Sequence, residues 1–196
     1  MNQIILASSS KRRKDILEKY NVNFKVIKSD IGEPFGKDDN PEELAMSLAF
    51  RKAYSVAKGN PDSVVIGADT VVYYKNEVFG KPKDEEDVKR MLNILNAKTH
   101  EVVTGISVIN LKENKKAIDF EKTKVLFRKL DENIINNYIK TKEPFGKAGS
   151  YAIQDIGALL VEGIEGSYLN VVGLPLVKLD KLLNRHFDIS ITNMIK

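Results

Sequence analysis

The chain contains no cysteine and no tryptophan. Without cysteine it has no disulfide, no thiolate nucleophile and no iron–sulfur or cysteine-bound zinc site, which excludes thiol and redox chemistry at cysteine. No apolar run approaches the roughly 18 residues of a membrane-spanning helix. Met1–Ser10 matches a short strand and lacks the layout of a signal peptide. Together these absences predict a soluble, cytoplasmic protein with no membrane partner.

Two widespread phosphate-binding patterns are also missing. The P-loop pattern GxxxxGK[ST] does not occur, and neither does the dinucleotide-binding pattern GxGxxG. A site for a nucleotide in this chain must therefore be built in another way.

The composition is that of an ordinary globular domain, with 196 residues of which 42% are hydrophobic. A chain of this size can bury ~70% of the surface that it exposes when unfolded, so it needs neither disulfides nor structural zinc to fold. We expect one domain over residues 1–196. The net charge of +4, from 31 basic and 27 acidic residues, is mild. What matters is therefore where the cations gather, and no specific nucleic-acid partner is expected.

Apolar residues alternate at strand spacing in some segments and recur at helical spacing in others, which predicts an α/β fold. Strands are expected at residues 3–7, 24–28, 63–74, 102–111, 117–127, 158–161 and 168–172. Helices are expected at residues 10–21, 40–58, 84–95, 132–140 and 175–185. The mixture of short strands and amphipathic helices favours a sheet covered by helices.

A basic helix start follows the first expected strand. Four consecutive cations, Lys11-Arg12-Arg13-Lys14, come directly after Ser8-Ser9-Ser10. The positive end of the helix dipole disfavours each cation there by ~0.3–1 kcal/mol. Backbone N–H groups, hydroxyls and two arginines at one place suit phosphate oxygens. A solvated basic helix end is the alternative that this segment alone leaves open.

Lys52 interrupts the apolar face of the expected helix at residues 40–58. At ~100° per residue it falls near the middle of the arc that faces the core. A lysine at such a position either extends past the apolar surface to water or projects into a polar cleft beside the core.

Asp69 is the one carboxylate within the apolar strand-like run of residues 64–72. An unpaired ionised carboxylate is very costly to bury, so Asp69 must be paired, bound to metal, protonated or placed at a cleft. The alternative is a turn aspartate at a break in the strand, because Gly67 allows a bend there.

Other polar residues carry weaker signals. Glu33 lies in a glycine- and proline-containing loop and could serve as a second carboxylate for a hydrated divalent cation. Lys81 and Gln154 lie at the edges of expected elements, where ordinary surface residues are also common. His100 and His186 show no metal-ligand spacing and are interpreted as structural.

Cations at a helix start, a core-facing lysine and two acids suit phosphoryl transfer on a polyphosphate. Water would be the nucleophile, because the chain has no cysteine and no convincing Ser–His pair. Several short motifs occur in order along the chain: Leu6-Ala7-Ser8-Ser9-Ser10-Lys11-Arg12-Arg13, Lys52-Ala53, Ile66-Gly67-Ala68-Asp69-Thr70, Gly80-Lys81-Pro82, Thr99-His100, Lys147-Ala148-Gly149, Tyr151-Ala152-Ile153-Gln154 and Gly166-Ser167-Tyr168. With this ordered set the whole chain resembles the Maf-like nucleoside triphosphate pyrophosphatases, in the subgroup that acts on dTTP and UTP.

The resemblance implies hydrolysis of dTTP and UTP, with modified pyrimidine triphosphates as further candidates, to the monophosphate and pyrophosphate. It implies that Asp69 is the proton acceptor that activates water at the α-phosphorus, with Lys52 and Lys81 as further catalytic residues. Residues implied to bind the triphosphate or select the base are Ser8, Arg12, Arg13, Thr70 and Gln154. Glu33 and Asp69 are implied ligands of a divalent metal, Mg²⁺ or Mn²⁺.

The implied fold is an elongated α/β domain with a twisted mixed sheet flanked by helices and two lobes around one cleft, as in Maf and inosine-triphosphatase-like proteins. The resemblance also implies a homodimer. A different class of function stays open: a regulatory protein of septum formation that binds nucleotide or nucleic acid and acts through partners. Asp69 separates the two, because a binding module gains nothing from a carboxylate that faces a polyanion.

Overall fold

The structure is a computed structural model that describes residues 3–32 and 40–195. One seven-stranded mixed sheet has the order β2-β1-β3-β5-β6-β7, with β4 paired to β3. The strands are β1 (Ile4–Leu6), β2 (Phe24–Val26), β3 (Val64–Tyr74), β4 (Glu77–Phe79), β5 (Thr99–Asn110), β6 (Lys115–Phe127) and β7 (Val161–Glu165). Strand β1 is parallel to β2 and β3, and the remaining pairs are antiparallel.

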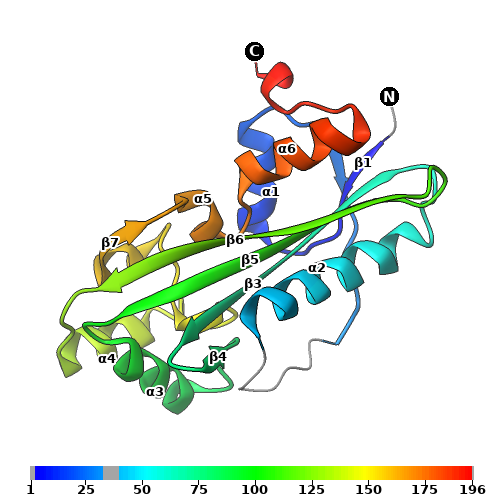
Figure 1. The fold of residues 1–196 in the computed structure, drawn as a ribbon. Coiled ribbons are helices and arrows are strands. Elements are labelled where there is room, and N and C mark those ends of the chain that lie inside the picture. The colour runs from blue at the N-terminus through cyan, green and yellow to red at the C-terminus, as the bar shows by residue number, and fades with distance from the viewer. Residues whose placement is uncertain (1–2, 33–39, 196) are drawn as a thin grey trace.

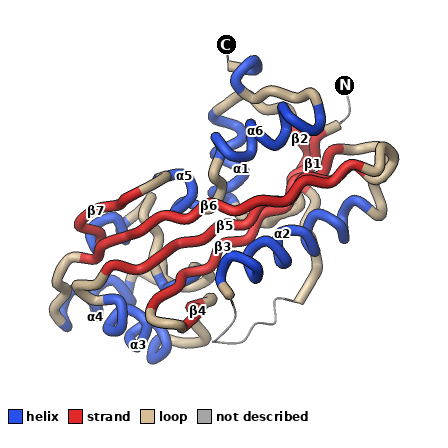
Figure 2. Tube along the Cα trace, viewed as in Figure 1, coloured by secondary structure: helices blue, strands red, loops and turns tan. Residues whose placement is uncertain are grey.

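Helices lie on both faces of this sheet (Figures 1 and 2). The α-helices are α1 (Lys11–Lys19), α2 (Pro41–Ala57), α3 (Glu85–Leu95), α4 (Glu132–Lys140), α5 (Tyr168–Val172) and α6 (Leu176–Phe187). Short 3₁₀ helices are η1 (Ala148–Ser150), η2 (Ile156–Leu160) and η3 (Thr192–Met194). The prediction of an α/β protein with a mixed, helix-flanked sheet is confirmed. No helix among the described residues is long and apolar enough to cross a membrane.

The long strands β3, β5 and β6 run the length of the molecule and connect its two ends (Figure 1). At one end α1 and α6 pack on the sheet through a core that includes Leu17, Ile66 and Leu183. At the other end α3 and α4 form a second core around Leu92 and Ile135. The molecule is therefore elongated, with two lobes that share one sheet.

Helix α2 covers the opposite face of β3 and β5 and packs unusually close to them. Its small residues meet glycines of the strands: a Cβ atom at Gly67 would lie 2.3 Å from the carbonyl oxygen of Ala49. A Cβ atom at Gly105 would lie 2.2 Å from the carbonyl oxygen of Ala45. The backbone of α2 is thus held against the middle of the sheet, which determines where its other side chains can reach.

The segment at residues 168–172, expected as a strand, is the helix α5. Its aromatic and β-branched residues favour a strand, but the ends of the segment decide otherwise. The side chain of Ser167 caps the helix by accepting from the backbone N–H of Asn170, and Gly173 ends it with a φ of 122°. The expected strand at residues 158–161 is also wrong, because most of it lies in η2 and the strand β7 begins at Val161.

Candidate active site

The candidate active site lies where the edge of β3 loses its partner. On that edge β1 pairs with Val64–Ile66, and β4 pairs with Val72–Tyr74. Within the described part of the chain, no strand pairs with residues 67–71 along this edge. A cavity of about 810 Å³ opens beside the gap, and both Asp69 and Thr70 line it.

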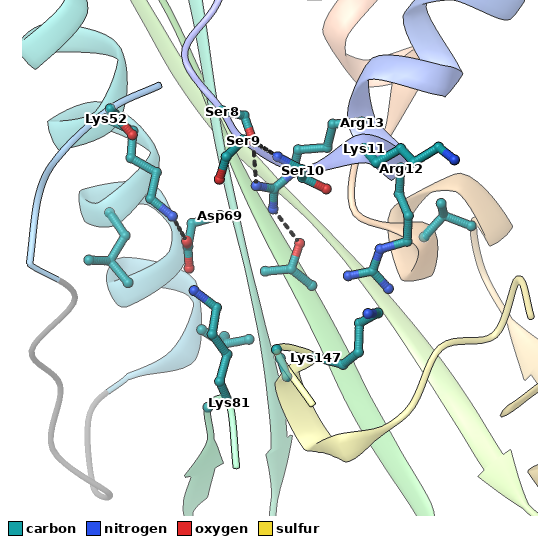
Figure 3. A pocket seen from close by; sticks show the side chains of 18 of the residues that line it. Ser8, Ser9, Ser10, Lys11, Arg12, Arg13, Lys52, Asp69, Lys81 and Lys147 are labelled. Atoms are coloured by element: carbon teal, nitrogen blue, oxygen red, sulfur yellow. Dashed lines mark hydrogen bonds and ion pairs between the residues drawn. The ribbon is translucent and has the colours of Figure 1, made fainter. Parts of the chain in front are cut away.

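Consecutive residues of a strand point to opposite faces of the sheet. Asp69 points toward α2 and makes an ion pair with the ammonium of Lys52, whereas Thr70 points toward α1. Because the strand edge is open here, one cavity collects side chains from both faces of the sheet (Figure 3).

Lys52 and Asp69 are both buried, with 8% and 7% of their surfaces exposed. For Lys52 the cleft interpretation is therefore confirmed over extension to open solvent. For Asp69 the turn interpretation is wrong, because β3 continues unbroken from Val64 to Tyr74. A buried carboxylate needs a partner, and the ammonium of Lys52 supplies a charged one.

Arg13 ties α1 to the other side of β3. Its Nε donates to the carbonyl oxygen of Gly173 at 2.8 Å, and its Nη2 donates to Oγ1 of Thr70 at 3.0 Å. Oγ1 of Thr70 also lies 2.9 Å from Oγ1 of Thr104, which donates to the carbonyl oxygen of Asn170 at 3.0 Å. This chain of buried and partly buried hydrogen bonds holds the guanidinium in one orientation at the cavity wall.

The serine segment forms the entry to α1. The backbone N–H of Ser10 donates to Oγ of Ser8 at 3.1 Å, and the first turn of α1 contains no acidic residue. Ser8, Ser9 and Ser10 all line the cavity. The N-terminus of α1 and its cations therefore border the same space as Asp69, which suits a phosphate group.

Two loops supply lysines from the other lobe. Lys81 follows β4 and Lys147 precedes η1, and both line the cavity. No local sequence pattern predicts a role for Lys147, although it belongs to one of the ordered motifs, Lys147-Ala148-Gly149. No pattern in the sequence links Lys147 to Asp69, and only the fold brings the two residues to the same cavity.

Arg12 and Lys147 face each other at one end of the cavity (Figure 3). Burial lowers the pKa of Arg12 below its usual value, and the carboxylates of Asp155 and Glu143 partly oppose that change. Burial also lowers the pKa of Lys147, and the positive charge of Arg12 lowers it further. This end of the cavity thus holds two cations that repel each other.

The sequence was compared with family models and with known proteins. The family model described as Maf-like protein matches residues 3–186. The chain belongs to the Maf-like family. The dTTP/UTP pyrophosphatase of Clostridioides difficile (strain 630) is 52% identical over 96% of this chain and 97% of its own length. The dTTP/UTP pyrophosphatase of Alkaliphilus oremlandii (strain OhILAs) is 47% identical over 97% of this chain and 100% of its own length.

Among solved structures, the Staphylococcus aureus Ham1 protein aligns with 64% of this Maf-like chain and 72% of its own chain. The TM-score is 0.45 and the sequence identity is 16%.

Most of the site residues expected for this Maf-like protein converge on the cavity. Those that line it are Ser8, Arg12, Arg13, Lys52, Asp69, Thr70 and Lys81. Gln154 does not line it: the residue is exposed, next to Asp155, whose charge acts on Arg12. Glu33 lies outside the described residues.

Two carboxylates at the cavity suit a divalent metal ion whose other ligands are phosphate oxygens of the substrate. Asp30 and Asp69 both line the cavity. Among the described residues no three acidic or histidine side chains form a metal-binding cluster. Mg²⁺ commonly binds through one or two carboxylates together with phosphate oxygens, so this donor set fits such an ion.

Proposed function

We propose that the protein hydrolyses dTTP and UTP to the nucleoside monophosphate and pyrophosphate. One observation carries the proposal: the Asp69–Lys52 ion pair lies in a cavity that the start of α1 and the cations Arg12, Arg13, Lys81 and Lys147 also line. A triphosphate needs those cations, and its hydrolysis needs a base. The names of the relatives, which are 45–52% identical over nearly the whole chain, support the same reaction.

In the proposed mechanism a water molecule attacks the α-phosphorus. Asp69 accepts a proton from the water as the new P–O bond forms. The bond between the α-phosphorus and the oxygen bridging to the β-phosphate breaks, and pyrophosphate leaves with the electron pair. The contact with Lys52 holds the carboxylate in one position, so that little reorganisation is needed when the proton is transferred.

The cations stabilise the charge that moves onto the leaving group. Lys52 reaches the cavity from α2 and Lys81 from the loop after β4, and Arg13 contributes from α1 beside Ser8. Donors placed before the reaction stabilise a developing charge most effectively where bulk water is excluded. We assign these residues to binding the triphosphate and stabilising its transition state.

We further propose that the reaction depends on Mg²⁺ or Mn²⁺. Asp69 would hold the ion, together with Asp30 among the described residues and Glu33 as the family resemblance implies. The bound ion would neutralise charge on the phosphate oxygens and so assist departure of pyrophosphate. A chelator should therefore abolish pyrophosphate release, and added Mg²⁺ or Mn²⁺ should restore it.

Selection of thymine and uracil is assigned to Arg12, Thr70 and Gln154. The hydrogen bond from Arg13 and the contact with Thr104 position the hydroxyl of Thr70. Gln154 can both donate and accept hydrogen bonds, which suits a pyrimidine edge. Gln154 is exposed and does not line the cavity, so this role requires its side chain to approach bound substrate.

The experiment that tests the function is a panel of nucleoside triphosphates with Mg²⁺ or Mn²⁺, scored for monophosphate and pyrophosphate. We expect dTTP and UTP ahead of CTP, GTP and ATP. A preference for purine triphosphates would overturn the assignment.

Asp69→Asn should abolish turnover while the circular dichroism spectrum stays unchanged. A regulatory nucleotide-binding protein, the alternative function, would instead bind nucleotide without turnover and tolerate this substitution.

We also propose that residues 1–196 form one domain and that the protein is a cytoplasmic homodimer. The support is the family resemblance, together with relatives whose whole length the chain matches. Sedimentation of the purified protein would test the dimer.

A further inference from the structure

Lys147 occupies a loop that is fixed to the lobe of α3 and α4, whose core includes Val72 and Ala148. The backbone N–H of Gly149 donates to the carbonyl oxygen of Gly80 at 3.1 Å, which joins this loop to the one carrying Lys81. A Cβ atom at Gly149 would lie 2.8 Å from Cγ2 of Val72, so the backbone lies directly on β3. These contacts hold the base of the Lys147 side chain in place at the cavity wall.

The end of the cavity bordered by Arg12 and Lys147 has hydrogen-bond donors in excess. The two side chains point toward each other from different lobes (Figure 3). Neither cationic group makes a hydrogen bond or an ion pair with a residue that the structure describes. Guanidinium and ammonium groups only donate hydrogen bonds. A ligand group bound between them must therefore present an acceptor.

The surroundings of this end favour a neutral acceptor over a phosphate. Asp155 and Glu143 act electrostatically on both Arg12 and Lys147, so negative charge lies nearby and opposes a further anion. Glu143 is already committed as an acceptor. Its oxygens accept from Tyr138 at 2.8 Å, from the N–H of Ile156 at 2.9 Å and from the N–H of Gly157 at 2.8 Å.

The opposite end of the cavity has a different character. Lys52, Lys81 and Arg13 approach Asp69 there, next to the serines that precede α1. If the triphosphate lies along these groups, as the proposed function requires, the nucleoside extends toward Arg12 and Lys147. The base then meets two donor-only groups.

We propose that Lys147, together with Arg12, donates a hydrogen bond to O4 of uracil or thymine and so selects against cytosine. Thymine and uracil carry an acceptor at this position, whereas cytosine carries an amino group that only donates. A site built to donate hydrogen bonds to its substrate rejects an analogue that leaves those donors without an acceptor. The inference rests on the proposed function and names a specificity-determining residue for it.

The test compares kcat/KM for UTP, dTTP and CTP in the wild type and three variants. Lys147→Met should lower the values for UTP and dTTP about ten- to a hundredfold, the range for a lost charged hydrogen bond, while the value for CTP changes about twofold or less. Lys147→Arg, which keeps a donor-only group, should retain the preference for UTP. Lys140→Met, at an exposed lysine of α4 outside the cavity, removes the same charge and should behave as the wild type.

A binding measurement separates a role at the base from a role at the phosphates. By calorimetry, Lys147→Met should weaken UMP about tenfold or more and leave pyrophosphate unchanged. Equal losses for all three triphosphates, or weakened pyrophosphate with unchanged UMP, would overturn the proposal. If the wild type hydrolyses no triphosphate, the proposed function fails. The role of Lys147 is then still decided by binding: the wild type should bind UMP more tightly than CMP, and Lys147→Met should lose that preference.

Discussion

Arg13 of α1 donates a hydrogen bond to Thr70 of β3 at 3.0 Å, next to the residue that we assign as the base. The two residues are 57 positions apart in the sequence. Their contact lies on one face of β3, and the ion pair between Asp69 and Lys52 lies on the other. One strand thus positions a guanidinium and a carboxylate by the simple alternation of its side chains.

Replacement of Arg13 by lysine should impair both stability and activity. Lysine cannot reproduce the fork that contacts Gly173, Thr70 and Ser8 together. We expect a loss of about 1.5–3 kcal/mol in unfolding free energy, as for hydrogen bonds to charged groups, and a fall of about tenfold or more in kcat/KM for UTP. Urea denaturation and steady-state kinetics measure the two effects.

The matched control is Arg51→Lys, because Arg51 is exposed on α2 and does not line the cavity. Equal unfolding free energies and equal kcat/KM values in the two variants would contradict the role assigned to the guanidinium of Arg13.

Gly67→Ala should separate α2 from the sheet. The new Cβ atom would overlap the backbone of α2, 2.3 Å from the carbonyl oxygen of Ala49. Overpacking of this kind costs about 1–3 kcal/mol, and because Lys52 lies on the next turn of α2, its contact with Asp69 should also be disturbed. We expect a lower melting temperature together with a lower kcat.

Gly163→Ala provides the comparison, since a Cβ atom at Gly163 meets nothing within 4 Å. A Gly67→Ala protein as stable and as active as Gly163→Ala would show that the close approach of α2 is not required.

His100 should make the protein less stable as the pH falls below about 6.5. The side chain is buried, its Nε2 lies 2.8 Å from the hydroxyl of Tyr151, and burial lowers its pKa to about 4. Between these two pH values the unfolded chain binds a proton that the folded protein does not, so stability is complete above pH 6.5 and declines toward pH 4. The loss should reach about 3 kcal/mol.

Urea denaturation at a series of pH values measures this dependence. His100→Gln should flatten the curve between about pH 6.5 and 4, whereas His186→Gln, at an exposed position of α6, should leave it as in the wild type. An unchanged curve in His100→Gln would assign the acid sensitivity to other groups.

Some site residues could be predicted because each is a charged residue at a position where the surrounding pattern is apolar. Lys52 breaks the apolar arc of a helix, and Asp69 breaks an apolar strand. In the fold the two charged groups form one ion pair, which compensates both buried charges. A charged residue at a core-facing position needs compensation, and the need is visible in the sequence even when the partner is not.

Other features could not be predicted from local pattern. Residues 168–172 have a strand-like composition, yet the cap at Ser167 and the positive φ of Gly173 make them a helix. The role of Lys147 has no local signal at all, because it depends on a loop held against Gly80 and Val72.

The sequence by itself determined the class of fold, the basic start of α1 and the need for a partner at Lys52 and at Asp69, since these follow from periodicity and from the cost of burying charge. Only the tertiary structure decided that β1 ends and β4 begins so as to leave residues 67–71 of β3 open within the described sheet. That gap depends on strand lengths and register across segments far apart in the chain. It is what brings Arg13, Lys52 and Lys147 to one cavity.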